Sequence, residues 1–128
     1  MTRISAAQAR KLLAKPKRSK YRAVAVVVDG IRFDSKAEAI HYATLIQQRR
    51  YTKIVDLKVH PRFDLHALSG KKVGVYEADF TFWDDDGELR VQDVKGVMTP
   101  LARRNIAHFE AEYGITVELI QAKRSGRA

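Results

Sequence analysis

VGVYEADFTFWDDDGELRVQDVK, residues 73–95, is the stretch that decides the fold. β-Branched and aromatic residues stand on both sides of Asp84-Asp85-Asp86-Gly87, a pattern typical of two strands joined by a turn. It predicts one continuous strand over residues 73–83 and an antiparallel partner over residues 88–95. Side chains alternate between the two faces of a strand. The core face of the first strand is therefore predicted to carry Tyr76, Ala78, Phe80 and Phe82.

The opposite face of this hairpin carries acids. A register that pairs Trp83 with Leu89 also pairs Asp79 with Asp93, with Cβ atoms about 5 Å apart. Two like charges so placed are unfavourable, and a divalent cation such as Mg²⁺, which prefers oxygen ligands, would compensate. Lys95 points to the same side as Asp93. Metal polarisation, an activated water and an ammonium are what phosphodiester hydrolysis requires, so a catalytic group is predicted here.

A plain ion pair explains the same residues. Lys95 could pair with Asp93, or with Glu77, which this register places opposite Lys95. Such surface pairs are common and contribute only about 0–1 kcal/mol. The spacing alone leaves both interpretations open.

Upstream, residues 21–28 and 31–33 are predicted strands joined by an Asp29-Gly30 hairpin turn. A helix is expected from residues 34–35 to Arg50, and a strand follows over residues 54–60. Pro61 interrupts it, and residues 62–68 continue as extended chain. The buried stripe of that helix is predicted to comprise Ala39, Tyr42, Ala43 and Ile46.

Glu38 has two possible roles in the first turn of that helix. Ser35-Lys36-Ala37-Glu38 matches a capping box, in which Glu38 bonds back to the Ser35 amide. Alternatively, Glu38 faces the strand site and adds an oxygen ligand for the metal. Both roles stay open at this point.

Downstream, Thr99 and Pro100 are typical of a helix start, and Gly114 of the position just after a helix ending at Tyr113. Residues 115–121 then form a strand. Because a helix separates it from residues 88–95, the two strands are expected to be parallel. The sequence therefore predicts an α/β (α+β) fold with a mixed sheet flanked by helices.

Charge is concentrated at the two ends of the 128-residue chain, which has a net charge of +9. Residues 1–22 carry eight Lys or Arg and no acid, residues 121–128 carry three more, and the remaining 98 residues hold 13 basic and all 15 acidic residues. Such ends favour a polyanionic partner, although solubilising tails would look the same. The expected nucleic-acid contacts are Lys15, Lys17, Arg18, Lys20 and Arg22.

Other features narrow the class of protein. Cysteine is absent, which excludes disulfides and thiolate metal sites and fits a reducing cytosol. No apolar run approaches the roughly 20 residues that span a bilayer, so no membrane segment is expected. The four histidines show no recognisable metal-binding spacing and are expected to be solvent-facing or hydrogen-bonded. One domain over residues 21–121 is predicted, with basic extensions at 1–20 and 122–128.

The combination of Glu38 on a helix, Asp79 on a strand and Asp93-Val94-Lys95 on the next, in the order αβββαβ, resembles the PD-(D/E)xK nuclease superfamily. VDGIRFDSKAEA (28–39), YEADF (76–80) and VQDVKG (91–96) look like a small phage- and prophage-borne family within it, formerly of unknown function. The resemblance covers roughly residues 20–120 and implies a restriction-endonuclease-like core. Two departures are Ala78, where the superfamily often has proline, and Asp93, where glutamate is commoner.

This resemblance implies a metal-dependent DNA endonuclease of the bacterial host cytoplasm, with branched DNA among its possible substrates. Asp79, Asp93, Glu38 and the Val94 carbonyl would hold Mg²⁺ or Mn²⁺, and Lys95 would orient the water or the scissile phosphate. Arg103 and Arg104 would contact the flanking DNA backbone, or else form a solvated helix face. Many relatives are homodimers, but nothing in this sequence establishes one.

Three other functions compete with a general nuclease. One is a non-catalytic nucleic-acid-binding protein, and another is a junction-resolving enzyme. The third is a structural phage protein or a ribosome-associated protein.

Overall fold

The computed structural model describes residues 25–122, and the basic extension predicted over residues 1–20 lies outside that range. The elements follow one another as β1 (Val26–Val28), β2 (Ile31–Phe33), α2 (Lys36–Gln48), β3 (Val55–Val59), β4 (Arg62–His66), β5 (Lys72–Glu77), β6 (Phe80–Trp83), β7 (Leu89–Lys95), α3 (Pro100–Tyr113) and β8 (Val117–Gln121). None of the helices in this part of the chain is both long and apolar enough to cross a membrane.

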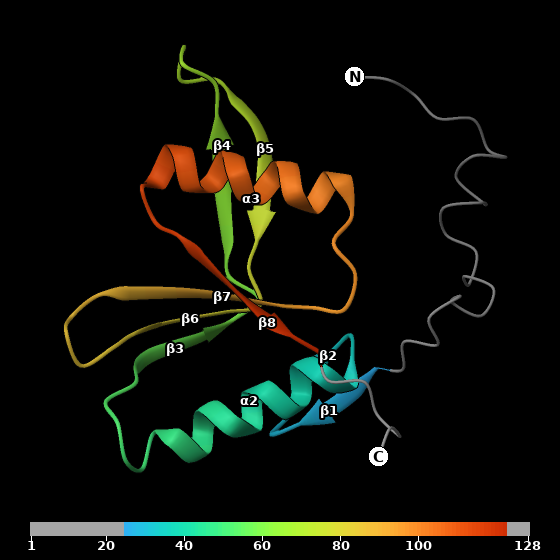
Figure 1. Cartoon of the computed structure of the whole chain (residues 1–128), viewed down its shortest axis with the longest axis vertical. Helices are drawn as coiled ribbons and strands as arrows, with labels where there is room; N and C mark the ends of the chain where they lie inside the picture. Colours follow the sequence, from blue (N-terminus) through green and yellow to red (C-terminus); the bar gives the residue numbers. More distant parts are fainter. Residues whose placement is uncertain (1–24, 123–128) are drawn as a thin grey trace, which may run out of the picture.

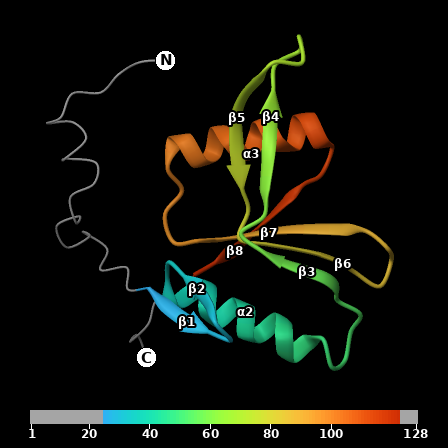
Figure 2. The ribbon, with the colours of Figure 1, turned by 180° about the vertical axis from the view of Figure 1, so that it is seen from behind.

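A four-stranded sheet in the order β3-β6-β7-β8 forms the centre of the molecule. β6 is antiparallel to β3 and β7, whereas β8 runs parallel to β7. The hairpins β1–β2 and β4–β5 are separate two-stranded sheets. Figures 1 and 2 show α2 and β1–β2 on one side of the central sheet, and α3 with β4–β5 on the other. The predicted mixed α+β fold with flanking helices is therefore confirmed.

Two hydrophobic cores fill the two sides of the sheet. The first lies under α2, where Tyr42 and Leu45 pack with Phe33, Phe80 and other apolar residues. The second lies under α3, where aromatic and aliphatic side chains of α3, β4, β5 and β7 meet. The four residues predicted to form the core face of the hairpin are all buried, but they divide between these cores.

The N-terminal hairpin and the start of α2 form as predicted. Asp29 and Gly30 have φ angles of 53° and 76°, the positive values that a tight two-residue hairpin turn needs. Ser35 caps α2 by accepting a hydrogen bond from the Glu38 amide at 3.2 Å. Ala43, however, is exposed, and Leu45 is buried instead at 1% exposure. The buried face of α2 is rotated toward Leu45 because the helix packs on Phe33 and Phe80.

The predicted strand over residues 73–83 is wrong, because the chain breaks at Ala78-Asp79 into β5 and β6. The preceding segment bends at the matching point, His60-Pro61. Ala78 donates its amide to the Pro61 carbonyl at 3.0 Å, and His60 donates to the Asp79 carbonyl at 2.9 Å. β3 and β6 thus stay in the central sheet while β4 and β5 turn away to cover α3. Three strands were expected between the two helices, and the structure has five, β3 to β7.

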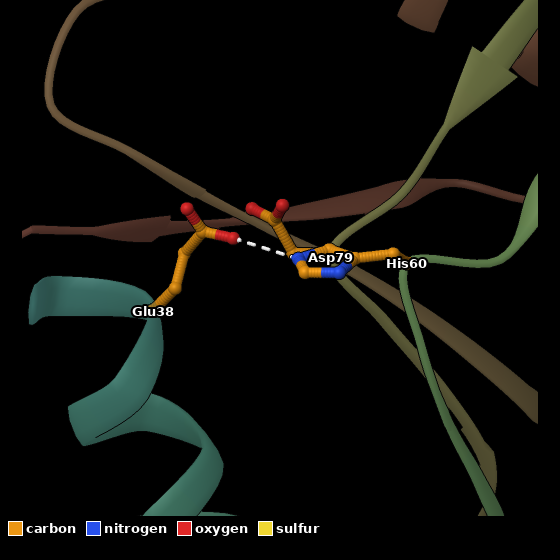
Figure 3. A group of neighbouring side chains, drawn as sticks. All are labelled: Glu38, His60 and Asp79. Carbon is orange, nitrogen blue, oxygen red and sulfur yellow. Dashed lines mark hydrogen bonds and ion pairs between the residues drawn. The ribbon is translucent and has the colours of Figure 1, made fainter. Parts of the chain in front are cut away.

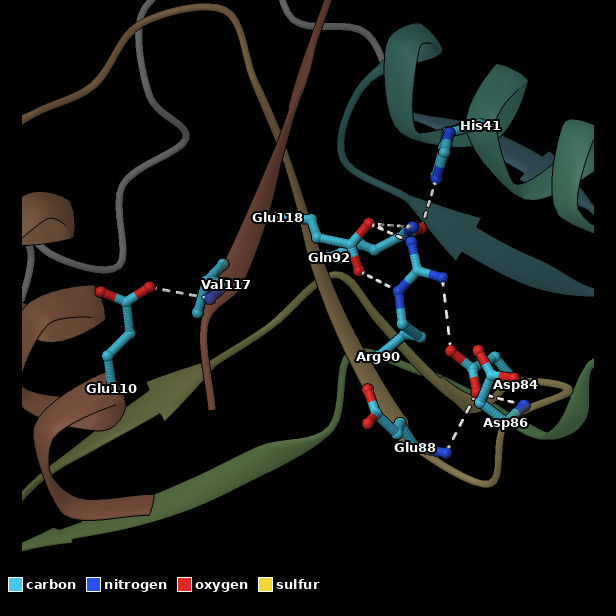
Figure 4. A network of polar contacts seen from close by, with 9 residues as sticks. All are labelled: His41, Asp84, Asp86, Glu88, Arg90, Gln92, Glu110, Val117 and Glu118. Carbon is cyan, nitrogen blue, oxygen red and sulfur yellow. Dashed lines mark hydrogen bonds and ion pairs between the residues drawn. The ribbon is translucent and has the colours of Figure 1, made fainter. Parts of the chain in front are cut away.

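The register around the 84–87 turn is the predicted one, with Trp83 opposite Leu89 and Phe80 opposite Gln92. A polar network on the α2 side holds β7 and β8 in place (Figure 4). Arg90 donates to both oxygens of Glu118 on β8, and Gln92 Oε1 accepts a 2.7 Å hydrogen bond from His41 Nε2 of α2. Downstream, Thr99 caps α3, Gly114 ends it with φ of 68°, and β8 is parallel to β7, all as predicted.

The packing of α2 can be tested with a matched pair of leucines. Leu45→Ala is expected to lower the free energy of unfolding by about 2–5 kcal/mol, because it removes a fully buried side chain. Leu68→Ala, at a fully exposed turn position, should change it by less than about 0.5 kcal/mol. Urea denaturation of the two variants measures both values. Equal costs for the two would contradict the observed burial of α2.

Candidate active site

Asp79 and Asp93 hold each other's backbone segments. The Asp79 amide donates to Asp93 Oδ1 at 3.0 Å, and the Val94 amide donates to Asp79 Oδ2 at 2.7 Å. The Asp79 amide also lies 3.1 Å from the Gln92 carbonyl, which continues the β6–β7 ladder. This reciprocal pair of bonds, the aspartate clasp, fixes both carboxylates where β6 begins. The convergence that the register predicted is present, although Asp79 lies in a bend rather than in a strand.

Asp93 is one of the most buried groups in the described part of the chain, at 1% exposure. Its Oδ2 accepts a 2.5 Å hydrogen bond from the Tyr76 hydroxyl, and Lys95 Nζ lies 3.7 Å from the same oxygen. Burial raises the pKa of Asp93, while the bond from Tyr76 opposes that rise. The Lys95–Asp93 ion pair is therefore real, but with one partner inside the protein it is not the surface pair considered from the sequence.

A second group of donors lies on the α2 side of Asp79. One ligand atom each from Glu38, His60 and Asp79 lies within 4.8 Å of the others (Figure 3). Glu38 is 9% exposed, its Oε2 accepts from the Ser35 hydroxyl at 3.2 Å, and its Oε1 lies 3.2 Å from His60 Nε2. Glu38 thus faces the site while its own amide is capped by Ser35. A bond from the Ser35 amide back to Glu38, the other half of a capping box, is not among its contacts.

The electrostatics of this group favour a cation. Burial, followed by the negative charge of Glu38, raises the pKa of Asp79 to about 7, and the bond from the Val94 amide only partly offsets this. Two facing carboxylates in a desolvated position repel each other when both are ionised. A divalent cation between them would remove that repulsion. The donor set is two carboxylates and an imidazole. Carboxylate oxygens bind Mg²⁺ and Mn²⁺, and an imidazole nitrogen binds transition metals, so the set fits a divalent cation.

Lys95 lies at the solvent-accessible edge of the site. Its side chain is 28% exposed and lines a cleft of about 370 Å³ between β5 and the first turn of α3. Asp93 and Tyr76 line the inner part of the cleft, and Arg62 and Glu77 are also in its wall. Glu77 is not opposite Lys95, because β5 pairs with β4 and places Glu77 opposite Arg62. An anionic group entering the cleft would therefore meet the Lys95 ammonium beside Asp93.

The other residues predicted for the site are placed as follows. Val94 lies in β7 between Asp93 and Lys95, and its amide is used by the clasp. Arg103 and Arg104 are exposed on α3 and do not line the cleft. The predicted contacts Lys15, Lys17, Arg18, Lys20 and Arg22 lie outside the described residues.

Two residues at the site were not predicted from the sequence. His60 was expected to be solvent-facing or hydrogen-bonded, and it is hydrogen-bonded to Glu38, but its place in the donor group with Asp79 was not predicted. Tyr76 was assigned to the core alone, yet its hydroxyl also anchors Asp93. A signal for His60 was available in its place directly before Pro61, since the residue before a proline is restricted and often marks a bend. No signal for the Tyr76 bond exists without the break at Ala78-Asp79.

The fold and the site define a small α+β protein with three acids, a histidine and a lysine gathered at one end of its central sheet. A protein-family model matches residues 18–125, and the chain therefore belongs to that family, which is described as protein of unknown function DUF1064. Searches of curated proteins and of solved structures gave no match.

The raised pKa of Asp79 predicts a pH-dependent stability of the metal-free protein. Between about pH 4 and pH 7 the folded protein keeps a proton that the unfolded chain has lost, so stability should fall as pH rises through this window. Asp79→Asn removes the titrating group. Urea denaturation in EDTA should show the variant more stable than wild type at pH 8, by on the order of 2 kcal/mol, and nearly equal to it at pH 4.

Asp86→Asn, at an exposed turn position, is the matched control and should show no such pH-dependent gain. A gain for Asp79→Asn that is as large at pH 4 as at pH 8 would contradict the electrostatic account of this carboxylate.

Proposed function

We propose that the protein is a metal-dependent endodeoxyribonuclease that hydrolyses DNA phosphodiester bonds. The observation that carries the proposal is the convergence of Asp79, Asp93 and Lys95 at one end of the central sheet, with Glu38 facing Asp79. The order of these residues along the chain adds the resemblance to PD-(D/E)xK nucleases. A protein that only binds nucleic acid gains nothing from buried acids that repel phosphate.

Each residue has a role that its contacts support. Glu38 and Asp79 supply carboxylate oxygens to a shared point. Asp93 is not part of that donor group; its Oδ1 accepts the Asp79 amide, and in the proposal it contributes to the metal site from beside Asp79. A bound Mg²⁺ or Mn²⁺ would polarise the phosphate and lower the pKa of a bound water. Tyr76 is a positioning residue, because its hydroxyl fixes Asp93. Lys95, at the wall of the cleft, would orient the water or stabilise charge on the phosphate.

DNA is the substrate that the charge distribution favours. The basic residues at both ends of the chain can bind a phosphate backbone through counterion release, while the acidic groups stay in the site. Arg103 and Arg104 on the exposed face of α3 are available to the same backbone. The resemblance extends the proposal to a phage- or prophage-encoded enzyme that acts in the bacterial cytoplasm, with a homodimer and branched DNA as its further expectations.

Cleavage assays on supercoiled, linear and branched DNA test this function. Wild type is expected to cut with Mg²⁺ or Mn²⁺ and not with EDTA. Asp93→Asn and Lys95→Ala should each lower the cleavage rate by on the order of 100-fold or more while DNA binding is retained. Lys95→Ala is the less disruptive of the two variants, because the Lys95 side chain is partly exposed whereas Asp93 is buried.

Lys58→Ala, which removes an exposed lysine on β3, is the control and should cut like wild type. If Lys95→Ala and Asp93→Asn both cut as fast as wild type, the residue assignment is wrong. If wild-type protein binds DNA but cuts no substrate with any divalent metal, a non-catalytic nucleic-acid-binding protein is the better description.

A further inference from the structure

His60 is held toward the carboxylates by its backbone as well as by its side chain. Its φ angle is 57°, in the left-handed region that residues other than glycine rarely adopt. The bond from its amide to the Asp79 carbonyl, at 2.9 Å, keeps the residue in this conformation. Unusual backbone angles of this kind cost of order 1 kcal/mol or more and are concentrated at functional sites.

The imidazole ring is oriented as well. It packs edge-on against Phe33, with ring centroids 5.9 Å apart and an interplanar angle of 61°. Nε2 then lies 3.2 Å from Glu38 Oε1, inside the group of donor atoms that includes Asp79 (Figure 3). A fixed ring with one nitrogen directed between two carboxylates is the arrangement of a metal-binding histidine.

We propose that His60 is a nitrogen ligand of the cation and that it makes the site selective for a transition metal of the Mn²⁺ class over Mg²⁺. Mg²⁺ takes oxygen ligands almost exclusively, whereas imidazole binds first-row transition metals well. With only carboxylates the site would accept Mg²⁺ readily, so the histidine decides the preference. The inference rests on the metal site of the proposed function but not on DNA cleavage.

The variants are chosen to keep the backbone at residue 60. His60→Asn is suitable because asparagine tolerates the left-handed conformation and offers an amide oxygen in place of nitrogen. His60→Asp makes an all-oxygen site. His41→Asn is the control, since His41 lies on the same helix as Glu38 but contacts Gln92, outside the donor group.

Calorimetric titration of the metal-free proteins with Mn²⁺ and with Mg²⁺ is the first measurement. Wild type and His41→Asn should bind Mn²⁺ at least about tenfold more tightly than Mg²⁺. His60→Asn should lose about tenfold in Mn²⁺ affinity with a much smaller change for Mg²⁺, and His60→Asp should shift the preference toward Mg²⁺. No preference in wild type, or equal losses for both metals in His60→Asn, overturns the proposal.

Electron spin echo spectroscopy of bound Mn²⁺ is the second measurement, because it detects directly coordinated nitrogen. The ¹⁴N modulation should be present in wild type and in His41→Asn and absent in His60→Asn. Its persistence in His60→Asn overturns the assignment. A protein that shows the His60 signal but cuts no DNA contradicts the nuclease proposal alone, whereas a nuclease without that signal contradicts this inference alone.

Discussion

The reciprocal hydrogen bonds between Asp79 and Asp93 are the constraint on which the site depends. Each aspartate side chain accepts a backbone amide from the other's segment, so neither carboxylate can move without breaking the junction of β6 and β7. The same junction is where the chain leaves the central sheet toward β5. This pair of bonds places the two acids side by side, at the point where the bonds of Ala78 and Asp79 to Pro61 and His60 turn β4 and β5 away from the central sheet.

The aspartate clasp has an electrostatic cost, which appears as the raised pKa of Asp79. It holds Asp93 in the interior and Asp79 close to Glu38, so burial and like charge raise the pKa of Asp79 to about 7. The buried carboxylates are stabilised by hydrogen bonds that some of their oxygens accept from the Tyr76 hydroxyl and from backbone amides. The remaining oxygens, with the His60 nitrogen, form a preorganised donor group, and such a group is of use to a protein that binds a cation.

Local signals allowed most of the fold to be predicted, because turns and caps depend on a few adjacent residues. The Asp29-Gly30 turn sets the register of β1 with β2, and the four-residue turn after Trp83 sets that of β6 with β7; both depend on adjacent residues only. The break at Ala78-Asp79 could not be predicted, since it depends on bonds to His60 and Pro61, nearly 20 positions earlier. The proximity of Asp79 and Asp93 could be predicted from the register of the hairpin around residues 84–87. The position of His60 could not, because it depends on the long-range bend at Ala78-Asp79.

A crystal structure of the protein grown with Mn²⁺, with diffraction collected at the manganese absorption edge, tests the central claim most directly. The account predicts an anomalous peak at about 2.1–2.3 Å from oxygens of Glu38 and Asp79 and from His60 Nε2, with Asp93 beside it. Saturating Mn²⁺ with no peak at that position, or Asp79 and Asp93 on opposite sides of the sheet, would contradict it.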